Sequence, residues 1–397
     1  MPQRLSTKQR AEVLRNWWAT FPYGGMAQRL EAIHQFEQQH GRLTEEEKRA
    51  AMFRVSPANK ERLGISKVFQ APTDMGEKEA LKLQEQLLDD SHYDLLLNET
   101  GLVETPAYEP LCILLKNCIP QSLLDEVRPV LRKAAAQRKI AGGRRGTAAG
   151  AGTVKRKRRD GSVSNMTGSP RLDDLPDDHF VRLKAAKDGI VGYLDRAIGG
   201  GQVYPCRLTH YSGALPQELA LMEQLAGAVA ESFKQSWVRD RWEAQFTKAG
   251  ETPPTWLLRT IDGITPFTTI TCNKSWRTAA HVDKGDLKEG FGVMCCLGDF
   301  EGCDLVFPRY RTAVRYREGD VILADVHQVH GNTPLLNPDG TVPTSRQPER
   351  LVCVFYYRQH MDQCLSTKAK EENFINRRER GDAIRKPKAK GKAAGRK

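Results

Sequence analysis

The chain has 397 residues, of which 39% are hydrophobic, and a formal net charge of +12. No apolar run reaches the roughly 18 residues that a membrane-spanning helix needs, and the N-terminus lacks a signal-peptide pattern, so we expect an intracellular protein without membrane contact. The nine cysteines include no Cys-x-x-Cys pair, which argues against a zinc ribbon or a disulfide scaffold and favours buried or free thiols in a reducing compartment.

The positive charge is concentrated in two segments. Residues 132–159 contain eleven basic residues and residues 385–397 contain seven, and neither segment contains an acidic residue. Together they hold more than the whole net charge, so the rest of the chain sums to −6. Flexible basic arms hold polyanions through phosphate contacts without sequence preference. We therefore expect both segments to bind DNA, with a solvated linker and tail as the alternative.

In chain order, residues 1–100 predict a helical N-terminal extension. Amphipathic or capped stretches indicate three helices, at residues 6–18, from Thr44 onwards, and at residues 76–90. No catalytic spacing occurs in this part, so we assign it no function. The pair Trp17-Trp18 fits a DNA contact, although aromatic pairs in helices more often belong to a core.

The next stretch combines a strand, a helix and a basic insert. Residues 111–116 form an apolar run typical of a strand, and residues 120–132 predict a helix capped near Ser122. The Gly/Ala-rich insert at about residues 139–170 has no apolar periodicity, so we expect it to be disordered until it meets a partner. It lacks the Gly-Lys-Ser/Thr ending of a phosphate-binding loop, and nucleotide binding is therefore not supported. Its pentamer 155–159 fits a nuclear-import signal or a DNA-binding arm.

Helical patterns return at residues 176–198 and 216–235. The second pattern has an apolar stripe that suits packing on the outer face of a sheet. Strands dominate from about residue 254 to residue 360, separated by turns that contain Gly and Asp. Residues 363–397 form a basic C-terminal tail, which we expect to be disordered from about residue 385.

The strand-rich part contains a metal-ligand pattern. His281 and Asp283 are two residues apart, so both side chains can reach one metal ion from a strand end. A turn and a buried strand in residues 319–325 lead to His330 as the third ligand. Two imidazoles and one carboxylate with open positions form the facial triad of non-haem Fe(II). His327 is the rival third ligand, and zinc accepts the same ligand types.

The order of His-x-Asp, about fifty residues, His, and then Arg350 on the last strand resembles the 2-oxoglutarate/Fe(II) dioxygenases over residues 105–362. In finer detail, the runs 281–286 (His-Val-Asp-Lys-Gly-Asp) and 325–334 resemble the TET/J-binding-protein family, which oxidises the methyl group of 5-methylcytosine or thymine in DNA. The resemblance implies an α+β fold with a double-stranded β-helix (jelly-roll, cupin-like) core, flanking helices and a helical N-terminal extension.

The same resemblance implies roles for the metal and co-substrate residues. His281, Asp283 and His330 would be the catalytic ligands of Fe(II). Arg350 would bind the C5 carboxylate of 2-oxoglutarate, and Arg346 is the other candidate for that role.

The resemblance also implies a substrate side of the pocket. Asp286 would face the target base, where a carboxylate accepts a hydrogen bond from the cytosine amino group. Asn273 and Arg277 lie just upstream of the motif and are further candidates for substrate binding. Their alternative interpretation is structure at a strand edge.

These patterns predict a dioxygenase that uses Fe(II), 2-oxoglutarate and O2 to convert 5-methylcytosine in DNA to 5-hydroxymethylcytosine and further products. An algal relative that shares the Asp286-type position uses ascorbate, which stays an alternative co-substrate. The target base must be flipped or single-stranded, because it is out of reach inside a duplex. We expect a monomer, nuclear in a eukaryote. The alternatives are a same-fold oxygenase of thymine, a protein side chain or a small molecule, and a catalytically silent DNA-binding protein.

Overall fold

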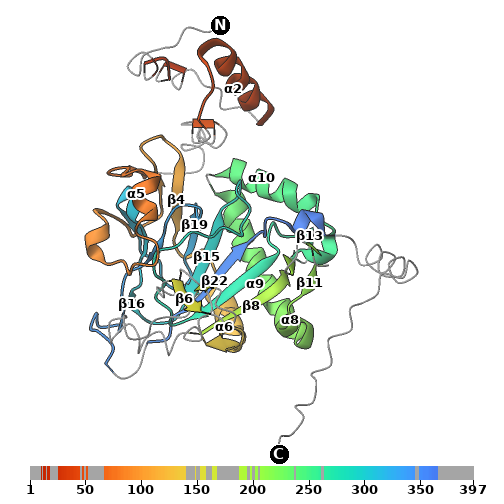
Figure 1. Ribbon diagram of the computed structural model, residues 1–397. Coiled ribbons are helices and arrows are strands. Elements are labelled where there is room, and N and C mark those ends of the chain that lie inside the picture. Colours follow the sequence, from red (N-terminus) through yellow and green to blue (C-terminus); the bar gives the residue numbers. More distant parts are fainter. Residues whose placement is uncertain are drawn as a thin grey trace, which may run out of the picture.

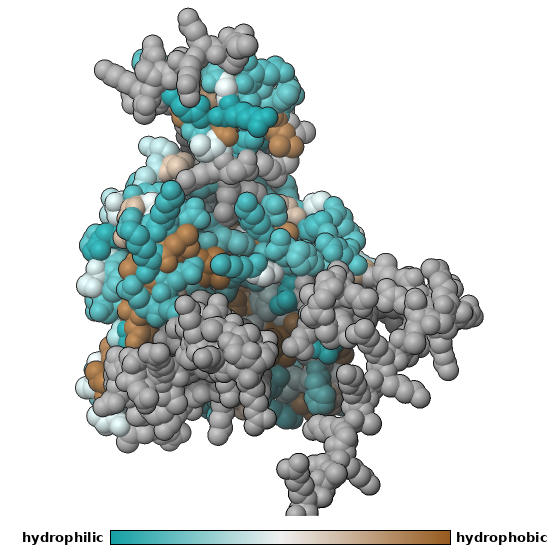
Figure 2. Space-filling model, viewed as in Figure 1, coloured by the Kyte–Doolittle hydropathy of each residue, from teal (hydrophilic) through white to brown (hydrophobic). Residues whose placement is uncertain are grey.

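The computed structural model describes most of the chain from residue 67 onwards and parts of the preceding region. The described residues are 10, 12–14, 16–17, 26–44, 47–48, 51, 67–139, 148, 153–157, 163–167, 187–194, 197–198, 202–203, 206–236, 238–260, 263–344 and 348–364. Within them, no helix combines the length and the apolarity that crossing a bilayer requires. In the view of Figure 2 their surface is mainly hydrophilic, and apolar residues gather towards the centre.

A mixed sheet, with ten strands among the described residues, forms the centre of the molecule (Figure 1). Its order is β1-β3-β4-β19-β15-β22-β14-β8-β11, with β5 paired beside β8. The central strands β15 and β22 consist mostly of β-branched, aromatic and cysteine residues and are almost completely buried, as expected of strands covered on both faces. The bounds are β1 Val68–Gln70, β3 Gly101–Glu104, β4 Pro110–Leu115, β5 Arg138–Lys139, β8 Lys187–Leu194, β11 Arg207–Leu208, β14 Thr269–Lys274, β15 Gly292–Leu297, β19 Val321–Ala324 and β22 Leu351–Tyr356.

Two helices cover one face of this sheet, α6 (Gln121–Ala135) and α9 (Pro216–Gln235). Helix α9 begins with a proline, and its buried residues recur every third or fourth position, so one apolar stripe faces the sheet as predicted. The short helix α8 (His210–Ala214) and helix α10 (Arg239–Gly250) contact α9. The helices share one core cluster with the sheet residues Val191, Ile270, Val293 and Phe355.

A smaller sheet of four strands, within the described chain, faces the other side of the main sheet. Apolar side chains from both sheets form one core cluster, which includes Met294 and Val352 of the main sheet and Leu305 and Val314 of the smaller one. Two facing sheets with helices outside make the predicted double-stranded β-helix of an α+β protein, so the predicted fold class is confirmed. The strands in order are β2 Leu95–Leu97, β18 Thr312–Val314, β17 Leu305–Phe307 and β20 Gly331–Asn332, and β16 Glu301–Gly302 pairs separately with β21 Leu335–Leu336.

The sheets begin well before residue 105, where the sequence placed the start of the dioxygenase domain. Strands β1 and β3 extend the main sheet, and β2 pairs in parallel with β18 of the smaller one. Three strands within residues 68–104 therefore belong to the two sheets, although the sequence assigned almost all of this range to a helical extension. Within residues 76–90, which are fully described, the α-helix is limited to α5 (Glu77–Leu81).

Further upstream, α2 (Met26–His40) lies apart from the sheets (Figure 1). Phe36 belongs to a small separate core cluster, and its ring lies 4.5 Å from that of Trp17. This contact agrees with the core interpretation of Trp17, whereas Trp18 lies outside the described residues. Arg29 of α2 pairs with Asp240 of α10 at 2.7 Å, which ties the helix to the main body.

The helix predicted for residues 176–198 is wrong where the structure describes it, because residues 187–194 form strand β8. Val191 and Tyr193 favour a strand, and two glycines allow close packing around it. A Cβ at Gly189 would lie 1.9 Å from the backbone oxygen of Ala134 in α6, and Gly192 has a positive φ of 92°. The helical periodicity seen in the sequence was therefore overruled by tertiary contacts.

The basic insert is ordered in part, contrary to prediction. Strand β6 (Thr153–Lys157) pairs antiparallel with β7 (Val163–Thr167). Ala148 is buried, and its oxygen accepts a hydrogen bond from the amide of Ala279 at 2.9 Å. Residues 140–147, 149–152, 158–162 and 365–397 lie outside the described residues, and with them most of the insert's remainder and the C-terminal tail.

The cysteines differ from prediction at one pair. A disulfide joins Cys206 to Cys364, which are 158 residues apart in the chain, while the other seven cysteines are free thiols as expected. The remaining short elements are β9 Ala197–Ile198, β10 Gln202–Val203, β12 Arg259–Thr260, β13 Gly263–Ile264, and the 3-10 turns Asp90–His92, Pro254–Trp256, Pro308–Tyr310 and Met361–Gln363.

Candidate metal centre and substrate pocket

Two backbone segments bring His281 and His330 side by side. The amide of His281 donates to the oxygen of His330 at 2.8 Å, and the amide of His330 donates back at 2.9 Å. The two rings lie with their centroids 4.4 Å apart. The amide of Asp283 donates to the oxygen of Val326 at 3.1 Å, which fastens the first segment to the second a second time. The fold thus fixes all three predicted ligands through their main chains.

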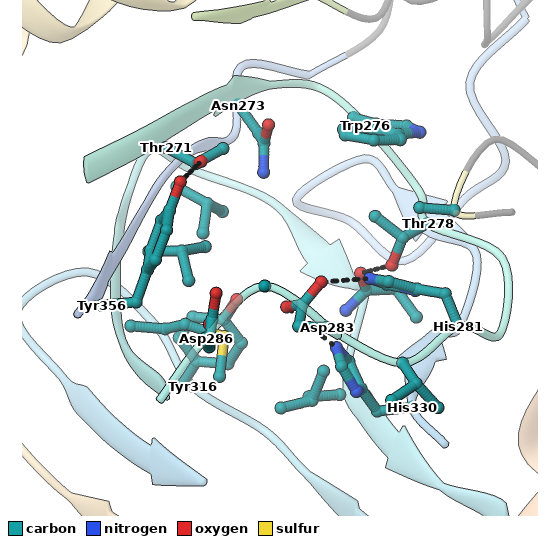
Figure 3. A pocket seen from close by; sticks show the side chains of 18 of the residues that line it. Thr271, Asn273, Trp276, Thr278, His281, Asp283, Asp286, Tyr316, His330 and Tyr356 are labelled. Atoms are coloured by element: carbon teal, nitrogen blue, oxygen red, sulfur yellow. Dashed lines mark hydrogen bonds and ion pairs between the residues drawn. The ribbon is translucent and has the colours of Figure 1, made fainter. Parts of the chain in front are cut away.

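In each of the two histidines, the two ring nitrogens have different surroundings. The Nδ1 atoms of His281 and His330 lie 2.8 and 2.9 Å from the backbone oxygens of Ala279 and Gln328. A carbonyl only accepts, so each Nδ1 must carry the proton and each Nε2 keeps a free lone pair. These Nε2 atoms lie 3.7 and 3.8 Å from the two carboxylate oxygens of Asp283 (Figure 3). Donor atoms from the three residues all lie within 4.8 Å of one another.

Electrostatics keeps His330 in the form that binds a metal ion. Its side chain is 5% exposed. Burial, followed by the nearby charge of His281, lowers the pKa of His330 to about 4. The imidazole is therefore neutral near pH 7. Two imidazoles and one carboxylate fit Fe(II) with open positions, and zinc accepts the same donors.

His327, the rival ligand, is directed elsewhere. Its Nδ1 lies 3.3 Å from Asp325, and its Nε2 lies 3.3 Å from the backbone oxygen of Asp286. It borders a second cavity of about 220 Å³ and is absent from the cluster of donor atoms. The structure therefore places His330, and not His327, beside His281 and Asp283.

The three ligands lie at one end of a cavity of about 280 Å³. Arg350 also lines this cavity and is 3% exposed. Its Nη2 donates to the hydroxyl of Tyr316 at 2.6 Å, while its Nε is buried without a hydrogen-bond partner among the described residues. A buried guanidinium with an unused N–H calls for an anion, and a carboxylate matches its geometry. Arg346, the other candidate, lies outside the described residues.

Alternate residues along β22 and its flanks face the cavity. Arg350, Val352, Val354, Tyr356 and Arg358 all line the cavity. The hydroxyl of Tyr356 lies 3.3 Å from that of Thr271 on β14, on the side of the pocket opposite His281 (Figure 3). The last strand and its flanking residues therefore supply both the cationic side chain of Arg350 and part of the wall of the cavity.

The predicted substrate residues separate into two groups. Asp286 lines the cavity and forms a β-bridge with Arg358 at its mouth. Asn273 lines it too, and its Oδ1 is buried without a partner among the described residues. Arg277 is instead structural: it donates to the backbone oxygens of Leu88 and Asn332 at 2.5 and 3.3 Å and is not among the lining residues.

Sequence reasoning missed several lining residues. Tyr316 and Trp276 could not be assigned because each depends on distant strands meeting in space. The indole nitrogen of Trp276 is buried without a partner within the described part of the chain. Ala148 of the basic insert also lines the cavity. The position of Arg358, eight residues after Arg350, was the one available signal, because it continues the same strand alternation.

Comparison with known proteins identifies the domain. Residues 190–359 match the family model Tet_JBP, the oxygenase domain of the 2OGFeDO superfamily. The bifunctional helicase and thymine dioxygenase JBP2 of Leishmania infantum is 35% identical over 158 residues, which are 38% of this chain and 13% of that protein. Thymine dioxygenase JBP1 of Trypanosoma brucei brucei is 31% identical over 215 residues, 50% of this chain and 24% of that protein.

Among solved structures, NgTET1 in complex with 5mC DNA is 11% identical, with a TM-score of 0.42, and the match covers 76% of this chain and 100% of that one. The matched part spans less than a quarter of the length of the two kinetoplastid relatives. Members of the matched superfamily use Fe(II), 2-oxoglutarate and O2, and the donor set described above fits that chemistry. Over residues 190–359, which are less than half of the chain, the protein is therefore similar to the oxygenase domain of the TET/JBP family within the 2OGFeDO superfamily.

Proposed function

We propose that the protein is an Fe(II)- and 2-oxoglutarate-dependent dioxygenase that oxidises the methyl group of a pyrimidine in DNA, with 5-methylcytosine as its first substrate. One observation carries the reaction class. A single cavity of about 280 Å³ holds the His281–Asp283–His330 cluster and the buried Arg350, whose Nε has no hydrogen-bond partner among the described residues. Iron and a dicarboxylate co-substrate require these two features in one enclosed space.

The protein's own groups prepare the site in three ways. The Nε2 atoms of His281 and His330 and the carboxylate of Asp283 would hold the iron, which activates O2 when the co-substrate is bound. Arg350, with Tyr316, would receive the distal carboxylate of 2-oxoglutarate and fix its orientation. Met294, Leu305, Val352 and Val354 line the cavity and exclude water around the reacting atoms. Because Arg350 can bind a carboxylate in this cavity, we favour 2-oxoglutarate over ascorbate as the co-substrate.

Asp286 supports cytosine as the base. Its carboxylate accepts hydrogen bonds only, so it matches the exocyclic amino group of a cytosine and opposes the O4 acceptor of a thymine. The side chain of Asp283 in the metal centre is 36% exposed, so the iron faces a space that a base can enter. A base reaches such a pocket only when it leaves the stack, which requires flipping or single-stranded DNA.

Thymine is the second candidate, supported by two observations. The two kinetoplastid relatives described above are thymine dioxygenases. Arg358 is beside Asp286 at the mouth of the cavity, and a guanidinium donates to the O4 acceptor of thymine. A protein side chain or a small molecule is a further alternative substrate, and no described feature of the pocket supports it.

DNA binding through the basic segments stays a prediction for most of their length. Arg132 pairs with Glu349 at 2.7 Å and Lys133 pairs with Glu218, so these two cations stabilise the fold. The remaining charges of residues 138–159 and those of residues 385–397 would hold the phosphates. A monomeric state and a nuclear location in a eukaryote are likewise predictions.

The test is an assay of product nucleosides by mass spectrometry. Purified protein, Fe(II) and 2-oxoglutarate are incubated with matched oligonucleotides that contain either 5-methylcytosine or thymine as the methyl-bearing base. We expect oxidised 5-methylcytosine with the wild type and with His327→Ala, and none with His330→Ala. Oxidised thymine alone would replace the first substrate by the second. Co-substrate turnover without any modified base would move the proposal to a substrate other than DNA.

A further inference from the structure

Residues 74–94, here called the strap, run along the metal centre although they precede the matched domain by about a hundred residues. The strap includes α5, which is drawn in orange in Figure 1 and contacts the turn Pro308–Tyr310. The amide of Glu85 donates to the oxygen of Ala280 at 2.7 Å, and the amide of Ala280 donates to the oxygen of Gln86 at 2.8 Å. The strap is therefore paired with the residue immediately before His281.

At its start, the strap also contacts Arg309, and Arg309 in turn contacts the segment that carries His330. Asp74 accepts from Nε and Nη2 of Arg309 at 2.7 and 2.8 Å, a bidentate pair. The side chain of Arg309 is 7% exposed, and its backbone oxygen accepts from the amide of Met75 at 3.1 Å. A buried guanidinium depends on its carboxylate partner, because an unpaired charge in such a place is strongly unfavourable.

From Arg309 the contacts continue to the metal ligand. Nη1 of Arg309 donates to the side-chain oxygen of Gln328 at 3.1 Å, and the side-chain nitrogen of Gln328 donates to Asp325 at 3.1 Å. Both ends of the Gln328 amide are thus held. The backbone oxygen of the same residue accepts the Nδ1–H of His330 at 2.9 Å, which sets the orientation of the ring.

A second cavity borders part of this segment. The second cavity, of about 220 Å³, is lined by Val282, Arg309, His327 and Gln328 among others. Val282 stands between His281 and Asp283 in the chain, so this cavity borders the segment of those two residues as well as the segment that leads to His330. Free space of this size lets the side chains of His327 and Gln328 shift if their hydrogen bonds are lost, because the cavity borders them on one side.

We propose that Asp74 is a positioning residue of the metal centre, which acts through Arg309 and Gln328 on the carbonyl that orients His330. The inference rests on the proposed function only in that the His281–Asp283–His330 cluster binds a divalent metal ion. Groups that orient a metal-bound histidine typically change metal affinity by about 10–100-fold when they are removed. Asp74 would be such a group, supplied from outside the matched domain.

The strap offers a matched control. Asp94 forms a bidentate pair with Arg311, two residues after Arg309, and that pair is more exposed and makes no contact with residues 325–330 among the interactions of the described chain. Asp74→Asn and Asp94→Asn thus remove the same charge from the same kind of ion pair. The two ion pairs differ in their exposure and in whether the arginine also donates a hydrogen bond to Gln328.

The experiment is a titration of the full-length, metal-free protein with Co(II), followed by the visible absorption of the bound ion, with melting temperatures measured without metal. We expect Asp74→Asn to raise the Co(II) dissociation constant about 10-fold or more and to change the absorption spectrum. Asp74→Glu should recover part of the affinity. Asp94→Asn should leave both affinity and spectrum as in the wild type.

Equal Co(II) affinity and spectra for Asp74→Asn and Asp94→Asn would overturn the proposal. If Asp74→Asn does not fold, Gln328→Ala takes its place, because it cuts the same path and leaves the buried ion pair intact; an unchanged spectrum then overturns the proposal as well. A wild type that binds no Co(II), or binds it no better than His330→Ala does, would refute the proposed metal centre itself. That result differs from failure of the strap alone, in which the wild type binds and His330→Ala does not.

Discussion

The two ends of the main cavity are built by different means. At the metal end, backbone hydrogen bonds fix His281, Asp283 and His330. On the opposite side of the cavity, side chains of β14 and β22 contact one another, as between Thr271 and Tyr356. Side-chain contacts can be exchanged without disturbing the sheet, whereas the metal ligands cannot be moved without moving the main chain. The reaction and the choice of substrate are therefore separable in this protein.

The largest expected effect comes from the metal end. His330→Ala should lose more than the roughly 10–100-fold in Fe(II) affinity that outer groups cost, together with all base oxidation. His327→Ala, three residues away, should retain both. Metal titration and the nucleoside assay measure the two quantities. Metal binding by His330→Ala at wild-type strength would show that the backbone-fixed cluster is not the centre.

Arg350 lies between the two ends and should show an intermediate effect. Arg350→Lys keeps the charge and loses the forked donor that a carboxylate requires. Because a hydrogen bond to a charged group contributes about 1.5–3 kcal/mol, 2-oxoglutarate affinity should fall about 10–100-fold. Calorimetric titration of 2-oxoglutarate in the presence of Mn(II) measures this. Metal affinity without co-substrate serves as the control and should not change.

At the mouth, Asp286→Asn should alter selection and leave metal binding unchanged. The amide can both donate and accept, so the preference for 5-methylcytosine over thymine should fall about 10-fold, within the 1–3 kcal/mol that base-reading contacts contribute. Competition between the two oligonucleotides in one reaction gives the ratio directly. An unchanged ratio with a lower overall rate would assign Asp286 to structure.

The smallest effect is expected on the far side of the sheet, at Glu349. The Arg132 guanidinium, and after it Lys274, hold the pKa of Glu349 below its ordinary value of 4.5. A carboxyl with a lowered folded pKa stabilises the protein above that ordinary value, and this contribution disappears as the pH falls through the folded pKa. Glu349→Gln should lower the free energy of unfolding at pH 7 by about 1 kcal/mol or less.

The difference between wild type and Glu349→Gln should shrink as the pH is lowered from about 4.5, because the wild-type carboxyl then becomes neutral too. Chemical denaturation at several pH values measures it. Oxidation of 5-methylcytosine should be unaffected at pH 7, since Glu349 is not among the residues that line the cavity. A gap that widens in acid would contradict the ion pairing.

The metal end was predictable from the sequence for the same reason that it is rigid. His281 and Asp283 are two residues apart in the chain, and the strand before His330 is an uninterrupted apolar run in the sequence. Arg350 followed from its position at the start of the last strand and from the family resemblance. The partners of these residues did not follow, because Tyr316, Trp276 and Asp74 depend on register between distant strands. The helix expected over β8 failed because contacts with α6, and not local periodicity, decide that segment.

The parallel pairing of β2 with β18 has a consequence for biosynthesis. Leu95 and its neighbours pair with residues more than 200 positions later. At the usual synthesis rate of about 5–20 residues per second, β2 waits roughly 10–40 s for its partner to be made. During that time the run Leu95-Leu96-Leu97 is an unpaired apolar strand, a typical target for chaperones and for aggregation. A protein shortened to residues 190–359 would instead leave β18 without β2 as its partner, so the chain from β2 onwards is needed to cover that strand edge.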